Sequence, residues 1–257
     1  GEDSHFWVTG VDETYLNSCE TLLAVTYLND HETVPADRPW EVPDAYVDTA
    51  EPVDLAEDED KQETVYAVNA QGTRNIAEVC RKLGCKMVYL STDYVFDGTG
   101  TEPWKPDCKD YSPLNVYGKT KLDGELAVSE LLEKYFIVRI AWVFGKNGKN
   151  FIKTMLSVGK NHDRLTVVDD QIGTPTYTYD LARLLVDMIE TENYGYYHAT
   201  NEGGYISWYE FAVEIFRQAA AMGHPEYDAE HLTVVPVTTE EYGVSKAARP
   251  FNSRLDK

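Results

Sequence analysis

A tyrosine and a lysine stand four residues apart in the segment Tyr117-Gly-Lys-Thr-Lys121. On a helix, residues four apart lie on the same face, one turn from each other. An ammonium group that close favours the phenolate and lowers the pKa of the phenol. Such a tyrosine can pass a proton to or from a reacting oxygen near neutral pH. Taken alone the pair indicates little, because an exposed tyrosine beside a solvated lysine arises by chance in many helices.

Two hydroxyl residues stand upstream of this pair. Ser91 and Thr92 directly follow the apolar run at 86–90, which has the composition of a strand. Side chains at the end of a parallel strand point into the crevice where ligands bind. We therefore predict that Thr92 hydrogen-bonds the same substrate oxygen that Tyr117 protonates. The alternative is that Ser91 or Thr92 merely caps the following turn.

Apolar periodicity predicts the elements that position these residues. Helices are predicted at 64–83, 116–134, 151–159, 179–191 and 208–222, and strands at 6–10, 86–91, 136–144, 165–168, 196–199 and 232–235. Strands that alternate with helices through short links form a parallel sheet with helices on both faces. The predicted fold class is therefore α/β, built on a doubly wound, mostly parallel sheet.

Composition excludes several classes of function. The chain carries 44 acidic and 23 basic residues, a net charge of −21. Such a charge repels phosphate backbones and anionic membranes, which argues against nucleic acid as a partner. No apolar run approaches the roughly 20 residues that span a bilayer. The four cysteines match no metal motif, and we expect reduced thiols in a cytoplasmic protein.

Four longer motifs narrow the interpretation. They are STDYVFDG at 91–98, SPLNVYGKTK at 112–121, DQIGTPT at 170–176 and RPFNSRL at 249–255. Together they resemble the extended short-chain dehydrogenases/reductases and, within them, the dTDP-4-dehydrorhamnose reductases. The resemblance covers about residues 53–257, and the set is far more specific than a Tyr-x-x-x-Lys pair.

The resemblance implies roles for single residues. Tyr117 would be the general acid that protonates the C4 oxygen as hydride arrives, Lys121 would lower its pKa and bind the nicotinamide ribose, and Thr92 would hold the C4 carbonyl. The implied substrate-binding residues are Tyr94, Trp142, Arg249, Asn252 and Ser253. The implied cofactor-binding residues are Gly10, Asn69 and Ser91, together with Tyr117 and Lys121. A packed core residue is the alternative for Trp142, and a helix-surface residue is the alternative for Asn69.

The resemblance also implies an activity and a domain plan. The activity is the NADPH-dependent reduction of the C4 keto group of dTDP-4-dehydro-rhamnose to dTDP-L-rhamnose, with NADH as the alternative cofactor. A Rossmann-like dinucleotide-binding domain is expected over residues 1–145. A smaller substrate-binding lobe is expected mainly over 146–257, with the chain crossing back to the first domain. The residues predict no metal site, but the resemblance allows Mg²⁺, a dTDP-sugar as substrate and a homodimer.

The N-terminal turn departs from this pattern. The family reads Gly-x-x-Gly-x-x-Gly there, whereas Gly10 is followed by neither of the other two glycines. Asp12 and Glu13 stand where an anion would bind and would repel it. Three interpretations remain open: a working reductase with a rebuilt phosphate loop, an impaired relative acting in regulation or partner binding, or a segment 1–52 that is not the native one. We predict weak dinucleotide affinity.

Overall fold

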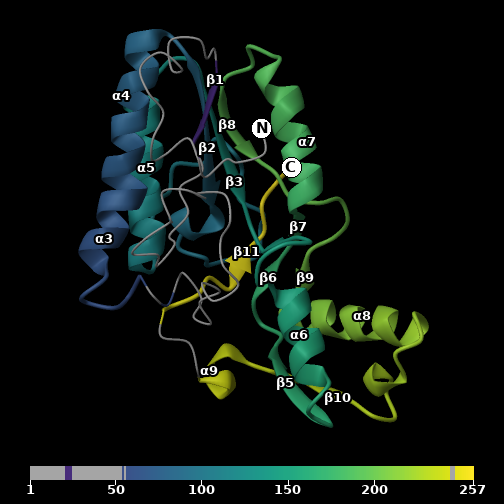
Figure 1. The fold of residues 1–257 in the computed structure, drawn as a ribbon. Helices are drawn as coiled ribbons and strands as arrows, with labels where there is room; N and C mark the ends of the chain where they lie inside the picture. The colour runs from purple at the N-terminus through teal and green to yellow at the C-terminus, as the bar shows by residue number, and fades with distance from the viewer. Residues whose placement is uncertain (1–20, 25–53, 55, 244–246) are drawn as a thin grey trace, which may run out of the picture.

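A computed structural model describes residues 21–24, 54, 56–243 and 247–257, and its centre is a parallel sheet (Figure 1). The strands lie in the order β1-β2-β3-β8, and each pairs with its neighbours in parallel. Their bounds are Thr21–Ala24 for β1, Lys86–Thr92 for β2, Tyr135–Ile140 for β3 and Gly195–His198 for β8. The strand predicted at 6–10 lies outside the described residues. Sequence reasoning missed β1, because a run of four residues is too short to show a period.

Helices cover both faces of this sheet (Figure 1). On one face lie α3 (Gln62–Tyr66), α4 (Thr73–Leu83) and α5 (Val116–Leu131), and on the other lies α7 (Thr178–Ile189). The strands are apolar on both sides, as a sheet buried between two helical layers requires. The core below α4 and α5 contains Ala77, Cys80, Cys85, Met87, Tyr89, Val128, Leu132 and Ile137. The core below α7 contains Val88, Phe136, Val138, Leu181, Leu185 and Ala199.

The helix predicted at 64–83 is not one continuous α-helix. Residues Ala67–Gly72 form a π-helical segment, labelled η3, between α3 and α4. One extra residue per turn hardly changes the apolar pattern, so periodicity could not reveal it. The end of α4 was predicted correctly, because Gly84 adopts a left-handed φ of 70° after Leu83.

The strand predicted at 136–144 is also interrupted. β3 ends at Ile140, Trp142 takes a positive φ of 51°, and β4 (Val143–Phe144) then pairs with β7 (Thr176–Tyr177). The apolar composition of the run is continuous, so the break is set by the tertiary position of Trp142.

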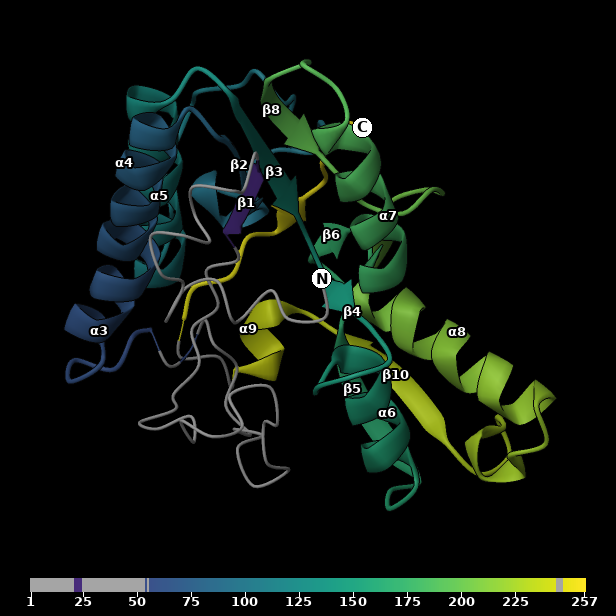
Figure 2. The same ribbon diagram turned by 45° about the horizontal axis from the view of Figure 1, so that its top comes forward.

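A smaller group of elements lies beyond the sheet (Figure 2). Helices α6 (Phe151–Gly159) and α8 (Trp208–Ala221) accompany β5 (Arg164–Val168) and β10 (Thr233–Val237), which pair in parallel. Their core contains Val167, Ala212, Phe216, Ala219, Tyr227 and Leu232. A three-stranded sheet joins β11 (Asn252–Ser253), β6 (Ile172–Gly173) and β9 (Ile206–Ser207), and a short helix, α9, spans Thr239–Tyr242.

The described residues include three of the four cysteines and every helix given above. Cys80 and Cys85 are buried, Cys108 is partly buried, and Cys19 lies outside the described part. None of the helices in that part combines the length and apolarity that crossing a membrane demands.

Candidate active site

Helix α5 presents the tyrosine and the lysine. Its start is fixed by Asn115, whose side-chain oxygen accepts the backbone N–H of Gly118 at 2.7 Å. Tyr117 is half-buried in the first turn of α5, and Lys121 lies one turn further along the helix. The four-residue spacing therefore acts on a helix, as predicted.

Lys121 is almost completely buried, with 2% of its surface exposed. Its Nζ donates to the backbone oxygen of Leu90 at 2.8 Å and lies 4.2 Å from the centroid of the Tyr89 ring. Burial lowers the pKa of Lys121 to about 7, and the charge of Glu125 opposes that shift. The lysine is thus a group that can change charge near neutral pH.

Thr92 is the last residue of β2 and is buried. Its hydroxyl donates to Asp93 Oδ1 at 3.0 Å and accepts the backbone N–H of Tyr94 at 3.3 Å. The second bond caps the short 3₁₀ helix η4 (Asp93–Val95). The capping role that stood as the alternative for Thr92 is therefore present in the structure.

Close packing brings η4 against α5. A Cβ on Gly118 would collide with the backbone oxygen of Tyr94, so the helix and the turn could not approach as closely with any other residue there. The rings of Tyr94 and Tyr117 meet edge to face, with centroids 5.7 Å apart and planes at 84°. The close approach places Tyr94 beside the proposed acid. Sequence reasoning passed over Gly118, although it lies inside the quoted motif.

Buried polar atoms lie near this group. Asn69 belongs to η3 and donates from Nδ2 to Thr120 Oγ1 at 3.1 Å, which ties η3 to α5. Among the described residues, Asn69 Oδ1 and Ser91 Oγ have no hydrogen-bond partner although both are buried. Buried polar atoms are normally paired, which makes these two atoms candidates for hydrogen bonds to a ligand. Gly10, the other predicted cofactor residue, lies outside the described part.

The C-terminal segment reaches the same region. Arg249 forms an ion pair with Asp54 at 3.1 Å, and its other terminal nitrogen lies 3.4 Å from the hydroxyl of Tyr94. Asn252 is buried and donates from Nδ2 to the backbone oxygens of Thr99 and Glu102, so its side chain holds that loop in place. Ser253 is buried beside Asp93.

Trp142 stands at the strand break in a conformation unusual for a residue other than glycine. Its ring stacks on Trp208, with centroids 3.7 Å apart and planes at 15°. A Cβ on Gly173 would come within 2.9 Å of the Trp142 ring. Both Trp208 and Gly173 therefore hold the indole in place, and this held conformation is of the kind that gathers at ligand sites.

A buried ion pair lies behind the site and was not predicted. Arg139 of β3 and Glu125 of α5 meet at 2.7 Å, and both side chains are fully buried. Arg139 also donates to the hydroxyl of Tyr111 at 3.0 Å and lies against the rings of Phe96 and Tyr196. Glu125 lies one turn beyond Lys121 on α5, so the pair anchors the helix that carries the catalytic candidates.

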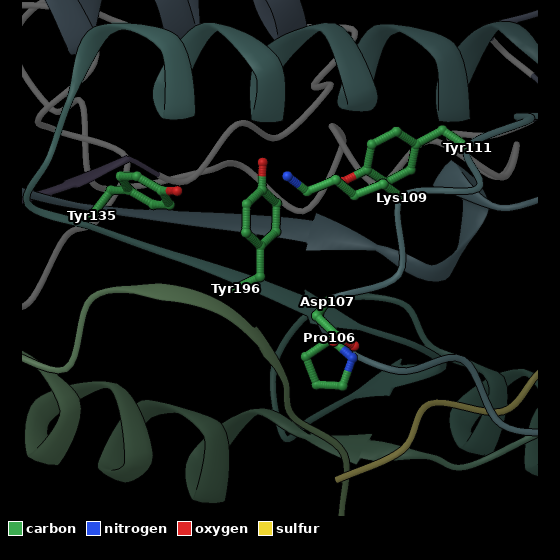
Figure 3. Close-up of a pocket in the computed structure, with 6 residues that line it drawn as sticks. All are labelled: Pro106, Asp107, Lys109, Tyr111, Tyr135 and Tyr196. Atoms are coloured by element: carbon green, nitrogen blue, oxygen red, sulfur yellow. The ribbon is translucent and has the colours of Figure 1, made fainter.

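A hollow of about 430 Å³ opens next to this ion pair, and its walls contain none of the candidate residues (Figure 3). It is lined by Pro106, Asp107, Lys109, Tyr111, Tyr135 and Tyr196. Tyr135 and Tyr196 come from the beginnings of β3 and β8, whereas Thr92 ends β2. Because ligands of parallel sheets bind at the carboxyl ends of the strands, we place the candidate site at Thr92 and not at this hollow.

The sequence profile of the family described as RmlD substrate binding domain matches residues 27–257. The chain belongs to the RmlD substrate-binding-domain family. This membership confirms the resemblance seen in the four motifs, and the match includes every described residue except 21–24.

Two relatives of this chain are both named dTDP-4-dehydrorhamnose reductase. The dTDP-4-dehydrorhamnose reductase of Aggregatibacter actinomycetemcomitans is 42% identical over 200 residues, which cover 75% of this chain and 66% of the relative. The enzyme of the same name from Escherichia coli K12 is 38% identical over 230 residues, covering 88% of this chain and 74% of the relative. The chain thus spans about two thirds to three quarters of the length of these relatives.

A solved RmlD-family structure confirms the predicted α/β fold. The dTDP-4-dehydrorhamnose reductase of Bacillus anthracis, in complex with NADP, superposes with a TM-score of 0.72 at 43% identity. The match covers 80% of this chain and 69% of that one.

The Mg²⁺ that the resemblance allows finds no support: among the described residues no cluster of three or more His, Cys, Asp or Glu side chains is placed to hold a metal ion.

Proposed function

We propose that this chain reduces the C4 keto group of dTDP-4-dehydro-rhamnose to give dTDP-L-rhamnose, with NADPH as reductant and NADH as the alternative. The observation that carries the proposal is the contact of η4 with α5. It puts Thr92 and Tyr94 beside the first turn of α5, where Tyr117 lies. The relatives that share the family bear the name of this activity.

The residues have distinct tasks in this reaction. Bound NADPH supplies the hydride that reaches C4. Tyr117 gives its phenolic proton to the C4 oxygen as negative charge develops there, and solvent later returns a proton to the phenolate. Lys121, one turn away on α5, stabilises that phenolate when it is charged. Thr92 donates a hydrogen bond to the same oxygen and so holds the carbonyl in line.

The described residues fit the nicotinamide end of the cofactor. Ser91 Oγ and Asn69 Oδ1 are buried acceptors without partners among the described residues, and the Lys121 ammonium lies between β2 and α5. The relative from Bacillus anthracis was solved with NADP. Residues that would hold the pyrophosphate belong to the turn after Gly10, outside the described part.

A second function is favoured by one observation. The turn after Gly10 carries Asp12 and Glu13 in place of glycines, which disfavours phosphate binding. An impaired relative that retains the fold for regulation or partner binding is therefore the alternative. The homodimer, the cytoplasmic location, and the boundary between residues 145 and 146 stay predictions under either function.

Consumption of NADPH separates the two functions. The purified chain is mixed with dTDP-4-dehydro-rhamnose, and loss of nicotinamide absorbance is followed with NADPH and then with NADH. Substrate-dependent oxidation that Tyr117→Phe removes supports the reductase. Binding of dTDP-rhamnose without oxidation of either cofactor, by a folded sample, supports the alternative.

A further inference from the structure

Thr92 has one hydroxyl proton, and in this structure that proton is already used. The hydroxyl donates to Asp93 Oδ1 at 3.0 Å and accepts from the backbone N–H of Tyr94 at 3.3 Å. A hydroxyl offers a single donor. While Asp93 is a carboxylate, Thr92 has no proton left for a substrate oxygen. Turning the hydroxyl away would leave a buried carboxylate oxygen unpaired, which is costly.

Asp93 is unusual because it is a carboxyl group with only 2% of its surface exposed. Burial raises the pKa of Asp93 to about 6, while contacts with Ser253 and Thr92 oppose the shift. Ser253 is near enough to favour the charged form, yet Asp93 Oδ2 accepts no hydrogen bond of normal geometry among the described residues. The group is therefore buried, poorly paired and bonded directly to Thr92.

The ionisable groups on the surrounding elements do not neutralise Asp93. Tyr117 and Lys121 lie on α5, and the Lys121 ammonium is bonded to the backbone of Leu90. Arg249, in the segment that leads to β11, is paired with Asp54 and lies against the Tyr94 hydroxyl. Among the described residues, the groups that act on the Asp93 charge are the hydroxyls of Thr92 and Ser253 and its own backbone N–H.

We propose that Asp93 is a positioning residue which, in its protonated form, donates to Thr92 Oγ1 and thereby releases the Thr92 proton toward the C4 oxygen of the substrate. The inference rests on the proposed reductase function. The protonated Asp93 carboxyl then donates a hydrogen bond to Thr92 Oγ1, and the Thr92 hydroxyl donates a hydrogen bond to the C4 oxygen of the substrate. No proton is lost from Asp93 in turnover, because the proton that reaches the product comes from Tyr117.

Protonation of Asp93 makes kcat depend on pH in a defined direction. Asp93 carries its proton below its pKa and loses it as the pH rises through that value, so kcat falls over that range. Asp93→Asn supplies an amide that can donate to Thr92 at every pH. We therefore expect kcat of Asp93→Asn to fall less than kcat of the wild-type enzyme between about pH 5 and about pH 8, because Lys121, with a pKa of about 7, titrates in both proteins.

Thr92→Val tests whether Asp93 acts through the threonine. Losing one donor to a developing oxyanion lowers kcat on the order of 100-fold. If Asp93 works through Thr92, the pH profiles of Thr92→Val and of Asp93→Asn/Thr92→Val coincide, because no hydroxyl remains to be turned. Ser253→Ala is the second variant: it removes a hydroxyl that favours the carboxylate, so the wild-type fall moves to higher pH.

Several results would overturn the inference. Asp93→Asn that raises KM and leaves the pH profile of kcat unchanged makes Asp93 a direct substrate contact. A folded Asp93→Asn with low kcat at every pH means that the carboxylate is the active form. If Asp93→Asn does not fold, an unmoved profile in Ser253→Ala decides against the proposal. A wild-type chain without turnover at any pH refutes the reductase function and this inference with it, whereas activity with these profiles absent refutes only the inference.

Discussion

Tyr117 is the general acid of the proposed reaction. Its ring packs edge to face on Tyr94 and its hydroxyl belongs to a half-buried side chain in the first turn of α5. We expect Tyr117→Phe to lower kcat roughly 100- to 10,000-fold, since it removes the general acid. Thermal unfolding should change little, because the ring is kept. Tyr66→Phe, on the exposed part of α3, is the matched control and should keep its turnover.

Lys121 gives a second prediction, this time on stability. Its pKa is about 7 in the fold against 10.5 as the ordinary value. Between these values the unfolded chain binds a proton that the folded chain does not, so the free energy of unfolding rises with pH across that window. Lys121→Met removes this dependence and also costs rate and cofactor affinity.

Urea unfolding at several pH values checks the lysine prediction. The difference between wild type and Lys121→Met should change steadily from about pH 7 to about pH 10. Lys119→Met, an exposed neighbour on α5, should show no such change. Equal slopes for wild type and Lys121→Met would show that Lys121 is not buried as described.

Residue types and spacing led to the prediction of Tyr117, Lys121 and Thr92, because a four-residue step places two side chains on one face of a helix and a hydroxyl at a strand end lies at the ligand-binding edge of a sheet. They were not enough to find Asp93 or the need for Gly118. Both depend on how closely η4 approaches α5, which is set by packing between segments more than 20 residues apart in the chain.

At the scale of elements, the ion pair of Glu125 and Arg139 holds α5 on β3. Both side chains are fully buried, so removing one partner leaves an uncompensated charge. We expect Glu125→Leu to lower the free energy of unfolding by about 3–5 kcal/mol, and Glu125→Leu/Arg139→Met to recover much of it. Urea unfolding measures both variants.

The exposed pair of Arg74 and Glu130 offers the control for this prediction. It joins α4 to α5 at 2.8 Å on the surface, where water screens the charges. Glu130→Leu should therefore change stability little. An equally small effect of Glu125→Leu would contradict the anchoring role of the buried pair.

Most elements followed from apolar periodicity, and α6 has the predicted bounds. Two failures have physical causes. The π-helical turn at Ala67–Gly72 shifts the register by a fraction of a turn, and the kink at Trp142 interrupts an apolar run without a glycine or proline to mark it. In both places contacts with the surrounding fold determine a backbone conformation that the local sequence does not predict.

At the scale of the whole molecule, a buried histidine predicts the response to acid. His198 ends β8 and bonds through Nδ1 to the backbone oxygen of Asp256 at 3.1 Å. Burial first, and the nearby charge of Arg139 second, lower the pKa of His198 to about 3. At a pH below the ordinary value of 6.5, His198 is protonated in the unfolded chain but stays neutral in the folded chain. The free energy of unfolding therefore decreases as the pH falls toward 3.

His198→Asn should weaken that acid dependence, because the amide can still donate to Asp256 but does not titrate. Thermal unfolding at about pH 7 and about pH 4 measures the loss in each protein. His162→Asn, on the exposed end after α6, should behave as the wild type does. A wild-type loss that His198→Asn does not reduce would place the acid sensitivity elsewhere.

The catalytic and sugar-binding candidates lie in the described part of the chain, whereas the turn after Gly10 lies outside it. The spacing after Gly10, with Asp12 and Glu13 in the turn, predicts weak affinity for NADPH. Two or three penalties of about 1.4 kcal/mol each, tenfold apiece, would move the dissociation constant from micromolar toward millimolar. Titration of nicotinamide fluorescence measures it, and low-micromolar binding would show that other groups hold the phosphates.

In the proposed reaction a hydride reaches C4 of the nucleotide sugar while Tyr117 protonates the oxygen. NADPH deuterated at the transferred position, incubated with dTDP-4-dehydro-rhamnose at a cofactor concentration high enough to offset weak binding, tests it directly. We expect dTDP-rhamnose that carries one deuterium at C4 by NMR, formed by the wild-type chain and formed roughly 100- to 10,000-fold more slowly by Tyr117→Phe. Deuterium at another position, equal labelling by Tyr117→Phe, or no label in the sugar would contradict it.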